Sequence, residues 1–329
     1  MQMQRQQGAV SITWPEPNFS GGAVVFDPGF THIRVDHHTS QADYIMSNPQ
    51  IAADKIASLW NLRIRECVGE TVRARIYKVD GPQGLSALKI YKHIGFSGEG
   101  AAIPFLRNLH PDFGVRIYRT STWRAAVLME WLEGPTLAEL VEKGERDLAI
   151  RNLSQAGANV QNTTFKLPFR YPKRGPKYRA VLTKAIKTLP PAQTPDALHR
   201  TRALLDYLIL STPEQKVIHG DLLFGNVILT EQGPKLIDPK GARNDPASEF
   251  AKALTPRDKT NVSGNLGNRL QSEATVMAEA IDVAPGRLIQ WVAVSIALDT
   301  FRIHEKKAAF DAKRLPLLHT VLDLIDRTT

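Results

Sequence analysis

Three polar side chains in the second half of the chain have the types and the spacing that phosphoryl transfer requires. Asp221 follows His219 and Gly220, Asn226 comes five residues later, and Asp238 lies beyond a short hydrophobic segment. A carboxylate can orient a hydroxyl group and accept its proton. An amide oxygen and a second carboxylate are ligands that suit Mg²⁺. We therefore predict that Asp221 is a catalytic base and that Asn226 and Asp238 bind Mg²⁺.

The order of these residues makes the prediction specific. A lone His-Gly-Asp is often only a turn or a cap. Here His-x-Asp-x-x-x-x-Asn is followed by a predicted hairpin and then by Asp238, which is the layout of a kinase catalytic loop and its metal-binding aspartate. We include His219 in the catalytic set and expect it to brace the loop by hydrogen bonding rather than to take part in the chemistry. Such a site also needs an upstream lysine and a nucleotide-binding sheet.

Lys89 is predicted to contact the phosphates of the nucleotide. In an extended segment the alternation of side chains places Ala87 and Lys89 on one face, and Leu88, Ile90 and Lys92 on the other. A small residue two positions before a lysine leaves room for the adenine base while the lysine reaches the phosphates. Lys89 is therefore preferred to Lys92, which shares its face with two core-type aliphatic residues.

Two further residues are candidates for the nucleotide site. Gly69 lies in the first turn of a predicted strand meander, where a glycine could let the backbone cover the phosphates. It is a single glycine and not the full Gly-x-Gly-x-x-Gly of protein kinases. Glu99 is the only carboxylate between Ile90 and Pro111, so it is the one candidate to pair with Lys89. The glycines around it leave open whether it lies in a helix or in a loop.

The segment Met129–Gly134 is predicted to connect two lobes and to bind the edge of the adenine ring through its backbone. We take Glu130 and Leu132 as its nucleotide-binding residues. A capping box at Thr136–Glu139 then begins a helix over residues 137–143. The order of these elements along the chain favours a connection between lobes over an ordinary edge strand that meets a helix.

The pattern of strands and helices predicts an α+β, bilobal protein in three parts. Residues 1–60 form an N-terminal extension of unknown role that ends in a helix from Pro49, residues 61–133 a β-rich nucleotide-binding lobe, and residues 134–329 a mainly helical lobe with the catalytic loop. The predicted strands span residues 62–68, 72–79, 85–91, 115–118 and 125–131. The later predicted helices span residues 147–160, 178–188, 195–210, 262–281, 287–304 and 315–327.

Composition agrees with an ordinary globular protein and favours the cytoplasm. Of the 329 residues, 43% are hydrophobic and 23% are charged, as in average globular domains. No apolar run is long enough to span a membrane, and the residues after Met1 lack the apolar region of a signal peptide. The single Cys67 excludes an internal disulfide and suits a reducing compartment. The sequence leaves open whether the protein is a monomer or a homodimer.

The net charge of +9 allows nucleic acid as an alternative partner. The densest basic cluster, residues 165–179, is interleaved with aromatic residues, and such rings can stack on single-stranded bases. We prefer the simpler interpretation of a solvated connection with a few buried rings, since ATP is itself an anion and a basic surface fits a nucleotide-binding protein.

The residues from His219 to Asn226, together with Ile237-Asp238-Pro239, resemble the aminoglycoside phosphotransferase family of small-molecule kinases. The run Asp238-Pro239-Lys240-Gly241, followed by Asp245-Pro246, looks most like its streptomycin and hydroxyurea-resistance branch, and Leu128–Gly134 resembles the hinge of the family. The likeness covers residues 60 to 310. The chain departs from the family at Gln161-Asn162, where members usually carry a Leu-His pair, and around Glu99.

The resemblance implies a protein-kinase-like fold and ATP-dependent phosphorylation of a small-molecule hydroxyl. It implies the same roles for Asp221, Asn226, Asp238 and Lys89. A catalytically inactive, kinase-like binding or regulatory protein is the alternative, although the full set of polar residues argues against it.

The acceptor is not indicated by the fold. A polycationic aminoglycoside needs a cleft rich in carboxylates, and residues 242–259 do not favour one, so a neutral or an anionic hydroxylated metabolite is equally acceptable. The charged residues of this segment are Asp245, Glu249 and Asp258 against Arg243, Lys252, Arg257 and Lys259.

Overall fold

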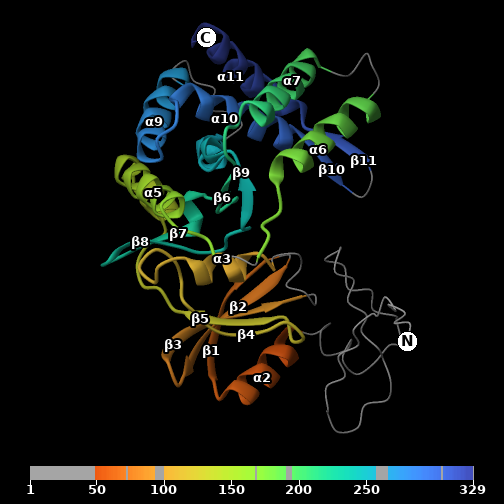
Figure 1. Cartoon of the computed structure of the whole chain (residues 1–329). Coiled ribbons are helices and arrows are strands. Elements are labelled where there is room, and N and C mark those ends of the chain that lie inside the picture. Colours follow the sequence, from red (N-terminus) through yellow and green to blue (C-terminus); the bar gives the residue numbers. More distant parts are fainter. Residues whose placement is uncertain are drawn as a thin grey trace, which may run out of the picture.

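Five antiparallel strands form the small lobe, as the alternating segments between residues 62 and 131 predicted. The computed structural model describes residues 49–71, 73–92, 100–166, 169–189, 195–256, 266–304 and 307–328. It shows a sheet-rich lobe and a helical lobe (Figure 1). The strands are β1 (Arg63–Glu70), β2 (Ala74–Gly81), β3 (Gly84–Tyr91), β4 (Ile117–Ser121) and β5 (Ala126–Glu130). They are hydrogen-bonded in the order β1-β2-β3-β5-β4, which places β3 at the centre.

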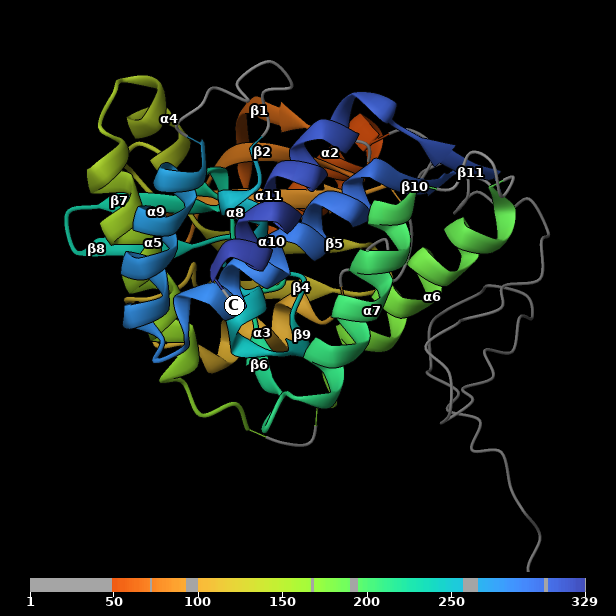
Figure 2. The ribbon, with the colours of Figure 1, turned by 90° about the horizontal axis from the view of Figure 1, so that it is seen from above.

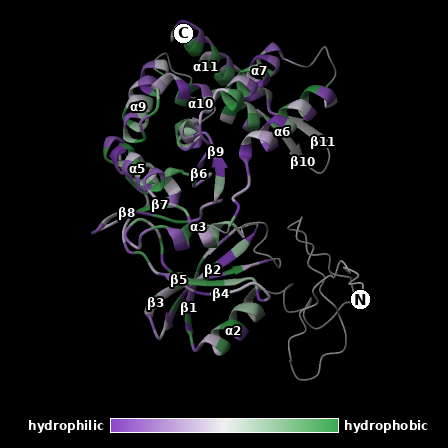
Figure 3. Ribbon diagram, in the orientation of Figure 1, coloured by the Kyte–Doolittle hydropathy of each residue, from purple (hydrophilic) through white to green (hydrophobic). Residues whose placement is uncertain are grey.

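The helix α2 (Pro49–Trp60) covers one face of this sheet. Its apolar residues recur at helical spacing, and Ile56 and Trp60 pack against Tyr77 and Leu88 of the sheet. The hydrophobic residues of both elements stand out in Figure 3. Because the helix buries its apolar side in the small lobe, we propose that this lobe begins at residue 49 rather than at residue 61.

The large lobe is mainly helical and is built around one central helix. Its elements are α4 (Leu137–Glu142), α5 (Arg146–Gln161), α6 (Arg174–Thr188), α7 (Asp196–Leu210), β6 (Lys216–Ile218), η3 (Phe224–Asn226), β7 (Val227–Thr230), β8 (Gly233–Leu236), β9 (Ala242–Asn244), η4 (Pro246–Ser248), α8 (Ala251–Leu254), α9 (Leu266–Ala280), α10 (Pro285–Thr300), β10 (Phe301–His304), β11 (Lys307–Phe310), η5 (Ala312–Arg314) and α11 (Leu315–Thr328). The helix α3 (Ala102–Asn108) lies between β3 and β4 in the chain and contacts β4 of the small lobe.

The central helix is α10, seen among α7, α9 and α11 in Figure 2. Four consecutive residues, Trp291 to Val294, are buried, so the helix is covered on all sides. No single helix in the described ranges is long and apolar enough to cross a membrane, although α9 and α10, bent by 114°, meet that test together on length and composition alone.

Two predicted helices have different boundaries in the structure. The helix predicted to run to His304 ends at Thr300, and residues 301–304 and 307–310 form the paired strands β10 and β11 instead. Phe301 is buried at the start of this hairpin, and the alternating Phe-Arg-Ile-His run fits a strand better than a helix. The helix predicted from Tyr178 begins four residues earlier, at Arg174.

Backbone and side-chain contacts join the two lobes beside their connection. The amide of Val115 donates to the Leu236 carbonyl at 3.0 Å, next to β8. The Lys235 ammonium group is 2.9 Å and 3.1 Å from the two carboxylate oxygens of Glu130 at the end of β5. Gly134 has a φ of 131°, and a Cβ there would collide with the Leu229 carbonyl oxygen. The connection therefore needs a glycine at this position.

Candidate active site

His219 braces the loop between β6 and β7 from inside the protein. Its ring is fully buried and lies edge-on to Phe105 at a centroid distance of 5.8 Å. Nδ1 is 3.3 Å from the Asp221 amide and Nε2 is 2.9 Å from the Ile237 carbonyl. These partners assign a neutral ring with the proton on Nε2, because an amide donates and a carbonyl accepts. Burial lowers the pKa of His219 to about 4, so both nitrogens serve the loop at neutral pH.

Glu249 also holds the loop between β6 and β7. It was not predicted from the sequence to be a site residue. Its carboxylate accepts the amide hydrogens of His219 at 2.8 Å and of Gly220 at 3.2 Å. Gly220 has a φ of 75°, a conformation that favours glycine. Glu249 is 2% exposed, and burial raises its pKa to about 7. The sequence assigned Glu249 to an acceptor region, and this is wrong because the carboxylate is buried under the loop.

The burial of His219 and Glu249 predicts opposite pH effects on stability. The pKa of His219 is lowered by folding, so its contribution is present above pH 6.5 and is lost as the pH falls towards 4. The pKa of Glu249 is raised, so its contribution is present below pH 4.5 and is lost as the pH rises through 7. We expect the two effects to offset each other between about pH 4.5 and 6.5 in the native protein.

Conservative variants separate the two effects. In Glu249→Gln the unfolding free energy should fall as the pH decreases from about 6.5 to 4.5, relative to the native protein, with a slope of at most about 1.4 kcal/mol per pH unit. In His219→Asn the slope should have the opposite sign. Urea unfolding at several pH values measures both, and equal slopes in the two variants would contradict the assignment.

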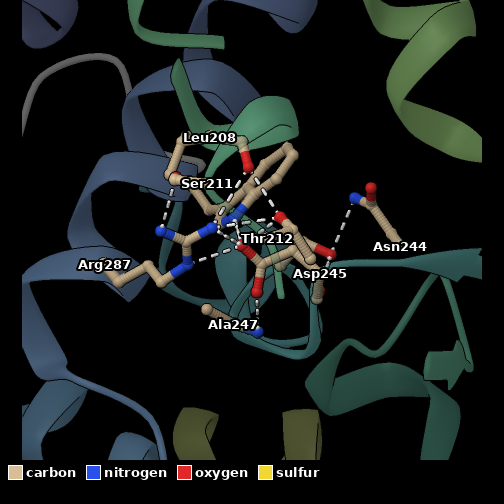
Figure 4. Close-up of polar contacts among 9 residues, drawn as sticks. Leu208, Ser211, Thr212, Asn244, Asp245, Ala247 and Arg287 are labelled. Carbon is tan, nitrogen blue, oxygen red and sulfur yellow. Dashed lines mark hydrogen bonds and ion pairs between the residues drawn. The ribbon is translucent and has the colours of Figure 1, made fainter. Parts of the chain in front are cut away.

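Asp245 holds the segment that carries Glu249. Its Oδ1 accepts the Ala247 amide at 2.9 Å and so caps η4. Its Oδ2 accepts from Arg287 Nε at 2.7 Å and from Trp291 Nε1 at 2.8 Å, both on α10 (Figure 4). Asp245 is 3% exposed. The expectation that it lies in the acceptor region is therefore wrong, since its carboxylate is occupied in the core.

Asp221 is partly exposed and lies between two lysines. Its side chain is 20% exposed, and its Oδ1 is 2.6 Å from the ammonium group of Lys252 at the start of the large lobe's α8. Its Oδ2 is 3.9 Å from Lys240 Nζ. A carboxylate in this position can be reached by a hydroxyl group, and an ionised carboxylate can accept that group's proton. The lysines were not predicted to contact it.

The β7–β8 hairpin brings the two predicted metal ligands to the same place. Val227 pairs with Leu236, and the Ile237 amide donates to the Asn226 carbonyl at 3.0 Å, so Ile237 lies opposite Asn226 and Asp238 is the next residue. The Asn226 amide nitrogen donates to the Asp221 carbonyl at 2.8 Å, which leaves its side-chain oxygen for a cation. No cluster of three His, Cys, Asp or Glu side chains exists in the described part of the chain. An Asn-Asp pair nevertheless fits Mg²⁺, which keeps waters and phosphate oxygens as its other ligands.

Lys89 reaches this site from the small lobe. Its ammonium group is 2.8 Å from Asp238 Oδ1, and its side chain is 8% exposed. Leu88 and Ile90 point the other way and are buried with α2, as the alternation predicted. Lys92 forms an ion pair with Glu70 at 2.9 Å. Lys89 and not Lys92 therefore faces the catalytic loop.

The structure gives a different outcome for each of the other residues predicted to contact the nucleotide. Gly69 lies within β1, opposite Ile76, so the expectation that it forms the first turn is wrong; the strand continues to Glu70. Glu99 lies outside the described residues. The Glu130 carboxylate is occupied by Lys235, and Leu132 packs partly buried against the large-lobe core. Nucleotide binding by the backbone of Glu130 and Leu132 stays a prediction.

Two aromatic residues of segment 165–179, Phe165 and Tyr171, pack inward. Phe165 lies 5.1 Å from Phe105 and 5.6 Å from Tyr171 between ring centroids, and Tyr171 is 6% exposed. Burial raises the pKa of Tyr171 to about 12. Phe165 and Tyr171 are therefore occupied in the core and are not presented for stacking on bases, whereas Phe169 is 37% exposed. The loss of these two rings weakens the support for nucleic-acid binding.

The chain is similar to a known protein family and to several solved structures. A model of the aminoglycoside/hydroxyurea antibiotic resistance kinase family matches residues 59–306. No curated protein matches the chain. Among solved structures, the ethanolamine kinase of Plasmodium vivax is 12% identical with a TM-score of 0.57, over 87% of this chain and 89% of that one.

Two further solved structures are similar. A choline/ethanolamine kinase family protein from Mesorhizobium loti is 14% identical with a TM-score of 0.54, over 86% of each chain. The aminoglycoside phosphotransferase APH(4)-Ia is 13% identical with a TM-score of 0.54, over 84% of this chain and 98% of that one. At these identities the likeness shows the fold alone, and the predicted bilobal fold is confirmed.

Proposed function

The chain belongs to the aminoglycoside/hydroxyurea antibiotic resistance kinase family and is a small-molecule kinase; from this premise we propose that it transfers the γ-phosphoryl group of ATP to a hydroxyl group of a small molecule. In this proposal Asp221 is the base, Asn226 and Asp238 hold Mg²⁺, and Lys89 contacts the phosphates. His219 keeps the loop in shape through its two ring nitrogens.

One observation carries the proposal. Lys89 of the small lobe and Asp238 of the large lobe meet at 2.8 Å although they are 149 residues apart in the chain. Asp238 is linked through the hairpin to Asn226, and Asn226 is hydrogen-bonded to the backbone of Asp221. Lys89, the Asn226–Asp238 pair and Asp221 thus lie in series across the junction of the lobes, and this arrangement supports their proposed roles in phosphoryl transfer.

In the proposed reaction Asp221 hydrogen-bonds to the acceptor hydroxyl group and takes its proton as the oxygen attacks the γ-phosphorus. The bond between that phosphorus and the bridging oxygen breaks, and ADP leaves. Lys89 offsets negative charge on the phosphates. Mg²⁺, when bound by Asn226 and Asp238, supplies further charge neutralisation. The loop itself stays fixed, since its amides are held by Glu249 and its imidazole by Ile237.

Purified full-length protein tests this proposal directly. It should bind ATP in the presence of Mg²⁺ and consume it with at least one member of a broad panel of hydroxylated compounds. Mass spectrometry of the product should show one added phosphoryl group on a hydroxyl oxygen. Absence of turnover across the panel would overturn the proposal, whether or not the nucleotide binds.

Lys89→Met is expected to weaken the use of ATP. Methionine keeps the length and the buried stem but removes a charge-assisted contact, which is typically worth a rough ten- to hundredfold in kcat/KM for ATP. Steady-state kinetics with ATP as the varied substrate measures this. Lys92→Met is the matched control, because Lys92 lies on the opposite face and pairs with Glu70; an equal loss in the control would contradict the role of Lys89.

A further inference from the structure

Within the described residues, the surroundings of Asp221 contain few available carboxylates and several cations. Of the acidic residues that the sequence placed near the acceptor, Asp245 and Glu249 are 3% and 2% exposed and are bonded within the core. Asp258 lies outside the described residues. The charged groups that approach Asp221 are Lys252, 46% exposed, and Lys240, 28% exposed.

A third cation approaches the catalytic loop from α6. A guanidinium nitrogen of Arg174 lies 3.7 Å from the position that a side chain on Gly220 would occupy, and Gly220 directly precedes Asp221. The Nε atom of Arg174 is buried and has no hydrogen-bond partner in the described structure. A buried donor of this kind is costly unless a partner satisfies it.

Two more cations continue this surface on both sides of the lobe junction. Lys177 lies three residues after Arg174 on α6, on the same side of the helix. Burial lowers the pKa of Lys177, and the neighbouring charges of Arg174 and Arg73 lower it further. Arg73 belongs to the turn between β1 and β2 of the small lobe. The lowered pKa of Lys177 agrees with a cationic surface here, and the positions of Lys252 and Arg174 beside Asp221 and Gly220 carry the inference.

We propose that the acceptor is an anionic hydroxylated compound, with a carboxylate or phosphate group near the reacting hydroxyl, and that Lys252 and Arg174 bind this anion. The inference rests on the proposed kinase function and narrows its substrate class. The anion replaces Asp221 as the partner of Lys252, so the same acceptor that presents its hydroxyl group also releases the base. A polycationic acceptor would instead place its ammonium groups beside Lys240, Lys252 and Arg174.

Matched sets of acceptors test the substrate class. Each set offers one carbon skeleton in anionic, neutral and cationic form, for example gluconate, glucose and glucosamine, at constant ionic strength. Among sets that are phosphorylated, we expect kcat/KM to be at least tenfold higher for the anionic member. Turnover only of neutral or cationic members would overturn this inference and leave the kinase function standing. ATP binding without turnover of any member would overturn both.

Variants test the residues. Lys252→Gln and Arg174→Gln should each raise KM for the anionic acceptor at least tenfold and leave KM for ATP within about twofold. Lys187→Gln, an exposed lysine in the last turn of the same helix α6, is the matched control and should change neither. Thermal melting checks that each variant is folded. A rise in KM for ATP with KM for the acceptor unchanged would assign these cations to the nucleotide and overturn the proposal.

Discussion

Asp221→Asn is expected to lower kcat for phosphoryl transfer by about 10²- to 10⁴-fold, the range that a general base contributes. Asparagine keeps the shape and can still orient a hydroxyl group, but it cannot take the proton. KM for ATP should stay nearly constant, because Lys89, Asn226 and Asp238 are unchanged. Pre-steady-state and steady-state rates with a phosphorylated acceptor measure the loss, and nucleotide titration by calorimetry measures binding.

The fold of this variant should be intact. The contact that Asp221 loses is an ion pair with a half-exposed lysine, Lys252, and such pairs contribute at most about 1 kcal/mol. Asp323→Asn, a change at an exposed carboxylate on α11, is the control and should leave kcat unaltered. If Asp221→Asn retains full activity, another group is the base. If the variant loses all turnover but keeps the protein's effect in cells, the protein acts as a kinase-shaped binding protein.

Much of the site could be predicted because its signals are local. The interval from Asp221 to Asn226 is a single loop, and a hairpin then returns the chain, so Asp238 had to lie near Asn226. The choice of Lys89 followed from the alternation of one strand. In each case the contact in space is encoded by spacing along the chain or by the period of an element.

The residues that were missed are held by partners distant in the sequence. Glu249 accepts amides 29 and 30 residues earlier, and Asp245 is bonded to Arg287 and Trp291 on another helix. The local sequence around Glu249 and Asp245 does not indicate these partners. A usable signal was the setting of Glu249 among Ala247, Phe250 and Ala251, since an acidic residue within an apolar run indicates a buried and bonded carboxylate.

The failures in the small lobe and near the C-terminus have a different cause. Gly69 was read as a turn because glycine favours turns, but β1 runs past it, with an irregularity in its pairing to β2 between Cys67 and Gly69. The run from Phe301 continues an apolar helix in composition, and its pairing with residues 307–310 overrides that tendency. Both are cases in which pairing between strands decides over local preference.

Arg287→Ala should produce a large loss of stability. The guanidinium group of Arg287 contacts the buried Asp245 carboxylate through Nε and Nη2, each at 2.7 Å. It also donates to Ser211, Thr212 and the Leu208 carbonyl (Figure 4). Removing one member of a buried pair leaves the other charge uncompensated, which costs about 3–5 kcal/mol. For a domain of this size the melting temperature should fall by roughly 10 °C.

The same variant tests whether α10 positions the catalytic loop. Asp245 caps η4, η4 leads to Glu249, and Glu249 holds the amides of His219 and Gly220, so loosening Asp245 should lower kcat at temperatures where the protein is still folded. Arg200→Ala is the control: its ion pair with Asp326 is exposed and should change the unfolding free energy by no more than about 1 kcal/mol. Urea unfolding and kinetics at 20 °C compare the two. Equal stability of the two variants would mean that Trp291 and the Ala247 amide suffice to hold Asp245. Arg287 would then not be needed to position the catalytic loop.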